Sequence, residues 1–203
     1  MGLQLVTGPA TEPLSVDDVR PFFRLVHDGA DSFLTPLIAA ARERCERITG
    51  RALISQQWKL TLTRWPSVGA ERSGDDYDLG GPLIRLPKPP LITVDEVKYV
   101  DLNGTLTTLA TNQYVVDTTT EPATISPAFQ SGSNAYVIWP IIRVQRAAIQ
   151  VKFTAGYGTS GADVPWEIKE RIKNYVAYCF EHPVERDERW LDTLFEGFDY
   201  GRA

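Results

Sequence analysis

The sequence predicts an α+β fold, in which helices from both ends of the chain form a small bundle around an inserted antiparallel β module. Helical periodicity occurs near both ends of the 203-residue chain, whereas the middle alternates apolar and polar residues. Turn residues separate the alternating segments at short intervals, which favours antiparallel strands over βαβ units. We expect four parts: an N-terminal helical part (1–50), the β module (51–160), a C-terminal helix packing on the N-terminal helices (161–184) and a C-terminal arm (185–203).

Two helices are expected before Gly50. Ser15 can cap a short first helix, because Asp18 follows three residues later. The second helix runs from about Asp31 to Thr49, and Gly50 stands in the usual position just past a helix end. Its apolar face consists of Leu34, Leu37, Ile38, Ala41, Cys45 and Ile48.

The β module begins where the period changes from helical to alternating. Trp58, Leu60 and Leu62 form the apolar side of a first strand. Asn103-Gly104 joins two later strands, because both turn residues tolerate a positive φ. The remaining strands are expected at 83–86, 94–100, 106–109, 114–116, near 125 and at 149–154, with a long exposed loop at 67–81.

The chain then returns to helix. Pro165 suits a first helical turn, where its missing N–H costs nothing. A short final helix is expected from Glu188 to Phe195. The stripe that packs the longer helix consists of Ile168, Ile172, Tyr175, Val176 and Cys179.

Composition argues against several classes of protein. The net charge of −5 disfavours a duplex-DNA binder, which needs a basic face to neutralise phosphates. Residues 181–203 carry seven carboxylates and three arginines, so most of the net charge lies there. The N-terminus lacks the pattern of a signal peptide, and the longest apolar run is too short to span a membrane. Cys45 and Cys179 are expected to be reduced and buried.

The turn after the last strand spells Gly156-x-Gly158-x-x-Gly161, the letters of a dinucleotide fingerprint. A phosphate site would need the helix to begin within the motif, so that its N–H groups point at the pyrophosphate. Pro165 delays the helix until after the last glycine, and the strands before it are antiparallel in pattern. We therefore interpret the motif as a structural turn and predict no cofactor.

Other candidate chemistry is weak. His27 and His182 are the only histidines, and both are interpreted as residues at helix ends rather than metal ligands. No serine lies in a Gly-x-Ser-x-Gly sequence. The cluster Asp75, Asp76 and Asp78 departs from the EF-hand spacing and is interpreted as a solvated loop. The sequence therefore predicts no catalytic and no metal-binding residue.

The C-terminal aromatics allow two interpretations. They either pack on the protein's own helices or form an arm that docks on a partner, because aromatic residues flanked by charge are good interface anchors. The candidate partner-binding residues are Trp190, Leu191, Leu194, Phe195, Phe198 and Tyr200.

Several segments, in this order, resemble the head–tail connector (head-completion adaptor) proteins of tailed bacteriophages and gene transfer agents. No single motif is specific, but the ordered set covers most of residues 3–182. The matching segments are Leu5-Val6-Thr7, Glu12-Pro13-Leu14-Ser15, Leu37-Ile38-Ala39-Ala40-Ala41-Arg42-Glu43, Thr49-Gly50-Arg51-Ala52-Leu53-Ile54-Ser55-Gln56-Gln57-Trp58, Ile84-Arg85-Leu86-Pro87-Lys88-Pro89-Pro90-Leu91, Val151-Lys152-Phe153-Thr154-Ala155-Gly156-Tyr157-Gly158 and Val164-Pro165-x-x-Ile168-Lys169.

The resemblance implies a non-enzymatic structural protein of the virion neck, made in the bacterial host cytoplasm. Such proteins form rings under the portal protein, usually dodecameric, extend the DNA channel and carry the stopper or tail-completion protein. DNA passes through without sequence-specific binding, and a neutral or negative lumen lets it slide. The isolated subunit is expected to be monomeric, with the portal as template for the ring.

In the family, the C-terminal segment commonly reaches toward the portal, which favours the arm. Deletion of residues 185–203 is then expected to leave the fold intact and to abolish portal attachment. The alternatives are another neck ring, such as a stopper or tail terminator, or a small ligand-binding or enzymatic β module.

Overall fold

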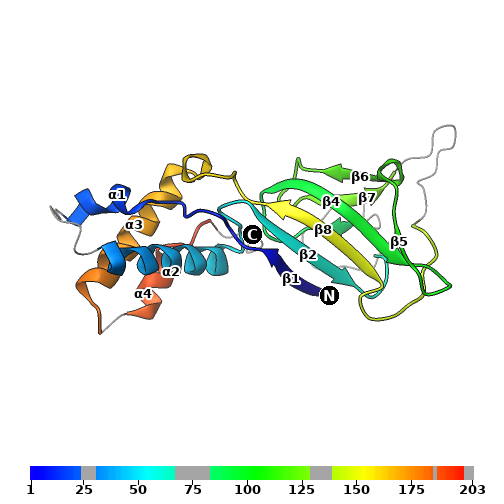
Figure 1. Ribbon diagram of the computed structural model, residues 1–203, viewed down its shortest axis with the longest axis horizontal. Coiled ribbons are helices and arrows are strands. Elements are labelled where there is room, and N and C mark those ends of the chain that lie inside the picture. The colour runs from blue at the N-terminus through cyan, green and yellow to red at the C-terminus, as the bar shows by residue number, and fades with distance from the viewer. Residues whose placement is uncertain (24–30, 67–82, 129–138, 185–186, 199–203) are drawn as a thin grey trace. The chain divides into compact units, whose positions relative to one another are not determined.

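The computed structural model describes residues 1–23, 31–66, 83–128, 139–184 and 187–198. It divides into two compact units (Figure 1). The β unit contains residues 1–7 and 57–155, and the helical unit contains residues 8–56 and 156–203. The α+β class and the insertion of the β module between helical segments are thus confirmed.

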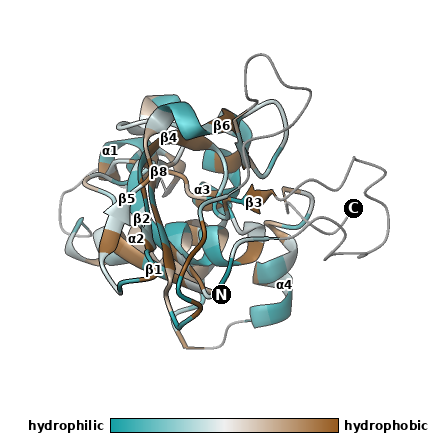
Figure 2. Ribbon diagram, turned by 90° about the vertical axis from the view of Figure 1, so that its right-hand side faces the viewer, coloured by the Kyte–Doolittle hydropathy of each residue, from teal (hydrophilic) through white to brown (hydrophobic). Residues whose placement is uncertain are grey.

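The helical unit is built around two long helices, and its helices carry both hydrophobic and hydrophilic residues (Figure 2). Ser15 caps the first helix as predicted: its hydroxyl accepts a hydrogen bond from the Asp18 N–H at 3.2 Å, and its own N–H donates to the Asp18 carboxylate at 2.8 Å. The apolar stripes of the two long helices share one core. The elements are α1 (Val16–Val19), η1 (Arg20–Phe23), α2 (Asp31–Thr49), η4 (Gly161–Asp163), α3 (Trp166–Glu181) and α4 (Glu188–Thr193).

The β unit holds two antiparallel sheets in its described residues, one ordered β1-β2-β8-β4-β5 and the other β3-β7-β6. The predicted hairpin at Asn103-Gly104 joins β4 to β5, where Val100 pairs with Leu106. Burial alternates strictly along β8, so its apolar residues form one side of the core. The strands are β1 (Gly2–Thr7), β2 (Gln56–Leu62), β3 (Ile84–Arg85), β4 (Leu91–Val100), β5 (Leu106–Thr108), β6 (Tyr114–Asp117), β7 (Thr124–Pro127) and β8 (Ile149–Ala155), and a short η3 (Thr111–Gln113) precedes β6.

The boundaries differ from the expected ones in two places. Residues 2–7 were expected in the N-terminal helical part, but they form β1, which pairs Leu3 with Leu60 and Leu5 with Trp58. Every residue of β1 is exposed, so the strand has no burial pattern and depends on a pairing more than fifty residues away. Residues 51–56 and 156–160, expected in the β module, belong to the helical unit.

Across the described ranges, no helix combines the length and the apolar character needed to cross a lipid bilayer.

Candidate functional site

The C-terminal segment (residues 187–198), which is the described part of the predicted docking arm (185–203), begins with a capped helix. The Asp187 side chain accepts hydrogen bonds from the backbone N–H groups of Arg189 and Trp190 at 3.0 and 3.1 Å. These bonds satisfy two of the donors that a helix start leaves free. The predicted helix therefore exists, although it ends at Thr193 rather than Phe195.

The apolar residues of this segment pack on the protein's own helices. Leu191 and Phe195 are fully buried in the core that α2 and α3 share. The Phe195 ring lies 6.1 Å from the Tyr175 ring, and Leu194 and Phe198 pack partly buried against the same core. Leu191 and Phe195 cannot bind a partner while this packing persists. Deletion of residues 185–203, expected from the sequence to leave the fold intact, would also remove these two core side chains, so we now expect it to destabilise the helical unit.

Arg44 of α2 fixes α4 through its guanidinium. Its Nε donates to the Asp192 carboxylate at 2.8 Å, its Nη2 donates to the Glu188 carbonyl at 2.9 Å, and its Nη1 pairs with the Glu188 carboxylate. Burial works to lower the pKa of Arg44, but the hydrogen bonds and charges of both acids outweigh it and raise the pKa above its usual value. Arg44 therefore stays charged.

Two further arginines hold the end of the segment. Arg171 of α3 donates to the Leu194 carbonyl at 2.8 Å, and Arg51 donates to the Phe198 carbonyl at 3.0 Å. These carbonyls follow a helix end, where backbone acceptors lack intrahelical partners. The sequence predicts a role for none of these three arginines, because their partners lie 23 to 148 positions away and no local spacing marks them.

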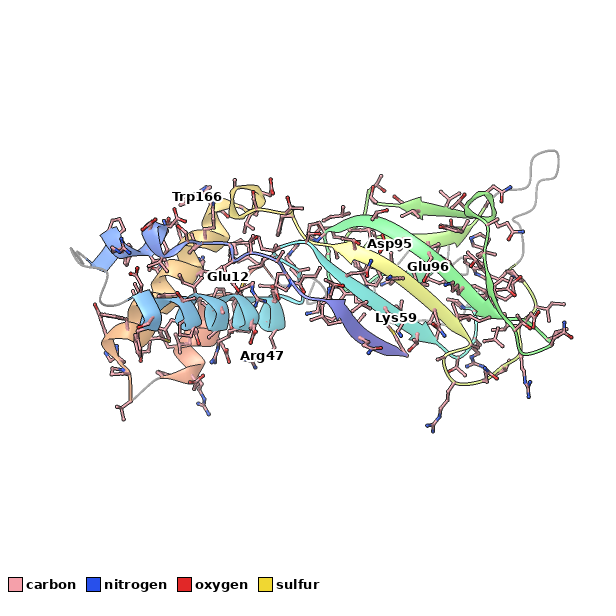
Figure 3. The ribbon with its side chains drawn as sticks, viewed as in Figure 1. Glu12, Arg47, Lys59, Asp95, Glu96 and Trp166 are labelled. Atoms are coloured by element: carbon pink, nitrogen blue, oxygen red, sulfur yellow. The ribbon has the colours of Figure 1, made fainter. Side chains whose placement is uncertain are left out.

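Among the described residues of the predicted arm's apolar set, Trp190 is the most exposed. Its ring lies 4.5 Å from the Tyr178 ring, yet the residue is 42% exposed. The Tyr178 hydroxyl accepts a hydrogen bond from the Asp187 N–H at 3.1 Å, which fixes the start of the same segment. Tyr200 lies outside the described residues. A second tryptophan, Trp166, begins α3 and is 69% exposed (Figure 3).

In the motif Gly156-x-Gly158-x-x-Gly161, the backbone conformation and the close packing at position 156 require a glycine. Its φ of 136° is rare for other residues, and an added Cβ would lie 2.6 Å from the Ile54 carbonyl carbon and oxygen. This close approach lets Ser55 donate its N–H to the Gly158 carbonyl at 2.7 Å and Tyr157 donate to the Leu53 carbonyl at 3.1 Å. Gly156 thus lets two backbone segments pair.

The other two glycines are also required by packing. A Cβ at Gly158 would lie 2.3 Å from the Asp163 carboxylate, and one at Gly161 would lie 2.4 Å from the Pro13 carbonyl oxygen. Asp163 forms a capping box with Ser160, and hydrogen bonds from the Ser160 N–H and hydroxyl lower the pKa of its carboxyl. Each glycine avoids a contact inside the helical unit, which supports interpretation of the motif as a structural turn.

A groove of about 320 Å³ lies between residues 11–16 and α2. Its ionisable group is Glu12, whose carboxylate accepts a hydrogen bond from Arg42 Nε at 2.8 Å. The groove therefore offers no unpaired acid or base for proton transfer.

The other predicted candidates are placed as follows. His182 ends α3, where its ring stacks on Tyr178 at 4.4 Å and its Nδ1 lies 3.1 Å from the Tyr178 carbonyl. Cys45 and Cys179 are buried free thiols. His27 and the cluster at 75–78 lie outside the described residues. In the ranges that are described, no three His, Cys, Asp or Glu side chains are grouped to hold a metal ion.

Comparison with solved structures gives matches over the whole chain. A chain from the neck of an empty gene transfer agent (GTA) particle, with C6 symmetry, is 25% identical, has a TM-score of 0.74 and is matched over 100% of this chain and 97% of its own length. The chain is similar to gene transfer agent neck proteins. A chain from the native GTA virion and one from the native GTA neck with C12 symmetry match at the same identity and coverage, with TM-scores of 0.71 and 0.63.

The gene-transfer-agent resemblance predicted from the sequence is thus confirmed. No protein-family model matches the sequence, and no curated protein matches it. The solved neighbours are components of a particle neck and virion, so the comparison supports a structural protein rather than an enzyme.

Proposed function

We propose that this protein is a structural subunit of a gene-transfer-agent or phage virion neck, and that it forms the head–tail adaptor ring under the portal. The observation that carries the proposal is the match to a GTA neck chain over the full length of both chains at a TM-score of 0.74. The particle necks that contain the similar chains have C6 and C12 symmetry, which supports assembly of this protein as a ring.

Within the neck, the adaptor position is favoured by helices from both chain ends around a β insert. An adaptor extends the DNA channel and acts by binding alone. Its partners would be the portal protein on one side and a stopper or tail-completion protein on the other. The solved neighbours are compatible with a stopper too, so the proposal is tested by direct binding to the portal.

Trp190 is the residue we assign to portal docking. It is half-exposed, contacts the Tyr178 ring, and belongs to a segment that Arg44, Arg171 and Arg51 hold in place. A large aromatic side chain on a rigid support loses little entropy on binding, which suits it as an interface anchor. Since Leu191 and Phe195 are buried, the docking surface is centred on Trp190 rather than on the whole arm.

The test is binding of the purified chain to purified portal protein, followed by electron microscopy of the particle neck. Trp190→Ala is expected to weaken portal binding about thirtyfold or more, as loss of a central anchor does. Phe33→Ala is the matched control and is expected to leave portal binding unchanged, because Phe33 of α2 is likewise half-exposed, at 46%, and its ring contacts one aromatic ring, that of Phe180, at 5.9 Å. Binding to a stopper or tail terminator but not to the portal would assign the protein to another neck ring.

A further inference from the structure

An exposed apolar and basic surface lies at one end of the β unit. Leu102 of the β4–β5 turn is 65% exposed, and Ile141 and Val144 of the segment 139–148 are 78% and 69% exposed. Arg143 and Arg146 are exposed in the same segment. We call Leu102, Ile141, Arg143, Val144 and Arg146 the tip patch. Exposed aliphatic residues gathered in this way mark interaction surfaces.

Backbone hydrogen bonds bring the two parts of the tip patch together. The Arg143 N–H donates to the Val100 carbonyl at 3.1 Å, and the Val100 N–H donates to the Ala148 carbonyl at 2.8 Å. In the turn, the Asp101 carboxylate accepts hydrogen bonds from the N–H groups of Asn103 and Thr105 at 2.9 and 2.8 Å. The turn and the segment are therefore held in register.

Two stacked tryptophans hold the start of the segment 139–148. Trp139 is buried, and its ring stacks on Trp65 at 4.5 Å with an interplanar angle of 6°. The Trp65 indole N–H donates to the Pro140 carbonyl at 2.8 Å. A segment that is neither helix nor strand is thus fixed at both ends. Such preorganisation lowers the entropy lost on binding, so the aliphatic side chains are presented ready for a partner.

The charge of the tip patch indicates an acidic partner. Among the described residues, neither Arg143 nor Arg146 forms an ion pair. The β unit has nine basic and nine acidic residues, a net charge of zero, whereas the helical unit has twelve basic and seventeen acidic residues, a net charge of −5. The complementary surface is therefore available on a second copy of this chain.

The first turn of α3 offers an aromatic and acidic surface of this kind. Trp166 is exposed there, and the adjacent Glu167 is exposed and forms no ion pair within the described ranges. Trp166 offers an apolar face to the aliphatic residues and a π surface to an arginine, and Glu167 offers a carboxylate. The other charged residues of that turn region are engaged: Lys169 donates to the Gly161 carbonyl, and Glu170 pairs with Lys173.

We propose that the tip patch of one copy docks on Trp166 and Glu167 of the next copy. The two surfaces differ, so the contact is heterologous, and repetition around an axis closes a ring. The proposal rests on the proposed function, because a ring subunit needs two complementary surfaces. It also separates the ring contact, at Trp166, from the portal contact, at Trp190.

The test is cross-linking between two variants that each carry one introduced cysteine, Val144→Cys on the tip patch and Ala162→Cys at an exposed position four residues before Trp166, which leaves Glu167 in place. The natural Cys45 and Cys179 are buried, so a short bismaleimide reacts with the introduced cysteine. Two preparations are compared. In the first, the purified variants are mixed at high concentration; in the second, they are mixed in the presence of purified portal protein. A heterodimer band in the mixture is expected, and only a contact between copies can produce it. Val144→Cys alone is the control.

Exchange of the charges at positions 143 and 167 is the second part of the test. Arg143→Glu is expected to reduce the heterodimer yield about tenfold, and the added Glu167→Arg change in the neighbouring copy is expected to restore it. Lys59→Glu, on β2 of the same unit, is the matched control and leaves the yield unchanged (Figure 3).

Three results would overturn the proposal: no heterodimer in either preparation, a Val144→Cys homodimer of equal yield, or no rescue by charge exchange. Failure of the proposed function would be recognised by a different measurement. Mass spectrometry would then find the chain absent from purified necks, whatever the cross-linking shows.

Discussion

Arg42 and Glu46 form a buried ion pair on successive turns of α2, with 3.1 Å between Nη1 of the arginine and Oε2 of the carboxylate. The other Glu46 oxygen accepts hydrogen bonds from the Leu53 N–H, at 3.0 Å, and from the Gln56 amide. Burial works to lower the pKa of Arg42, but the hydrogen bond to Glu12 and the charges of Glu46 and Glu12 raise it above its usual value. Glu46 thus joins α2 to the chain that leaves it.

Glu46→Ala is expected to lower the free energy of unfolding by about 3–5 kcal/mol, as removal of one partner from a buried pair does. The change leaves the Leu53 N–H and the Gln56 amide without their acceptor, and it removes one of the carboxylates paired with the buried Arg42, which keeps Glu12 and Glu43. Urea denaturation followed by circular dichroism measures the loss. Glu43→Ala is the matched control, since Glu43 contacts the same arginine at 3.5 Å from an exposed position, and a loss below about 1 kcal/mol is expected there. Equal losses for the two variants would contradict a central role for Glu46.

Gly156→Ala separates the structural-turn interpretation from a phosphate site. The added Cβ meets the Ile54 backbone at 2.6 Å and also suffers the strain of a positive φ, so a loss on the order of 3 kcal/mol or more is expected. Gly197→Ala controls for the φ strain alone, because Gly197 has a φ of 96° and no atom within 4 Å of an added Cβ; its expected loss is about 1–2 kcal/mol.

Thermal scans of both variants, with and without a dinucleotide, give the measurement. A nucleotide that binds the native state would raise its melting temperature. No such rise is expected for the wild-type protein. Equal destabilisation of the two variants, or stabilisation by the nucleotide, would count against the structural turn.

The sequence was sufficient for the elements whose signals are local. The capping box at Ser15, the stripe on α3, the alternation along β8 and the turn at Asn103-Gly104 each depend on residues a few positions apart, and the structure confirms them. The ordered family segments carried the resemblance, which the solved neck structures confirm.

The features that the sequence did not reveal depend on long-range contacts. β1 is exposed on both faces and exists through its pairing with β2. The sequence of α4 does not distinguish apolar residues that bind a partner from apolar residues that pack on the protein's own core. Arg44 pairs with Glu188 and Asp192, which follow it by 144 and 148 residues. These long-range contacts hold α4 against α2, with Leu191 in the core. The tip patch likewise combines two segments about forty residues apart, so no local motif marks it.

Leu191 and Trp190 are adjacent in α4, but we expect Leu191 to act on stability and Trp190 mainly on portal binding. Leu191→Ala is expected to lower the free energy of unfolding by about 2–5 kcal/mol, because the side chain is fully buried. Trp190→Ala is expected to cost less, since part of its surface is already exposed, and to act mainly on portal binding. A chain ending at Val184 is expected to melt at a lower temperature than the full chain. Unchanged melting of that truncated chain would show that the segment does not stabilise the helical unit.

Cys45 reports on opening of the helical core. Burial raises the pKa of its thiol to about 12, and the nearby Glu46 charge adds to the shift. Because the thiolate is the reactive form, the native thiol is expected to resist alkylation at pH 8. Its modification, followed by mass spectrometry, is expected to accelerate only in the range of urea that unfolds the protein. Val144→Cys, exposed on the tip patch, is the control that reacts at once.

The same shift predicts how stability changes with pH. In the unfolded chain the thiol loses its proton near its ordinary pKa of 9.0, whereas in the folded chain it keeps the proton up to about 12. The unfolded state therefore binds fewer protons between these values, and stability falls as the pH rises through that window. Cys45→Ala is expected to remove this thiol's share of the pH dependence above pH 9, measured by urea denaturation at pH 8 and 10. Rapid alkylation of native Cys45 at pH 8 would mean that this part of the core opens without global unfolding.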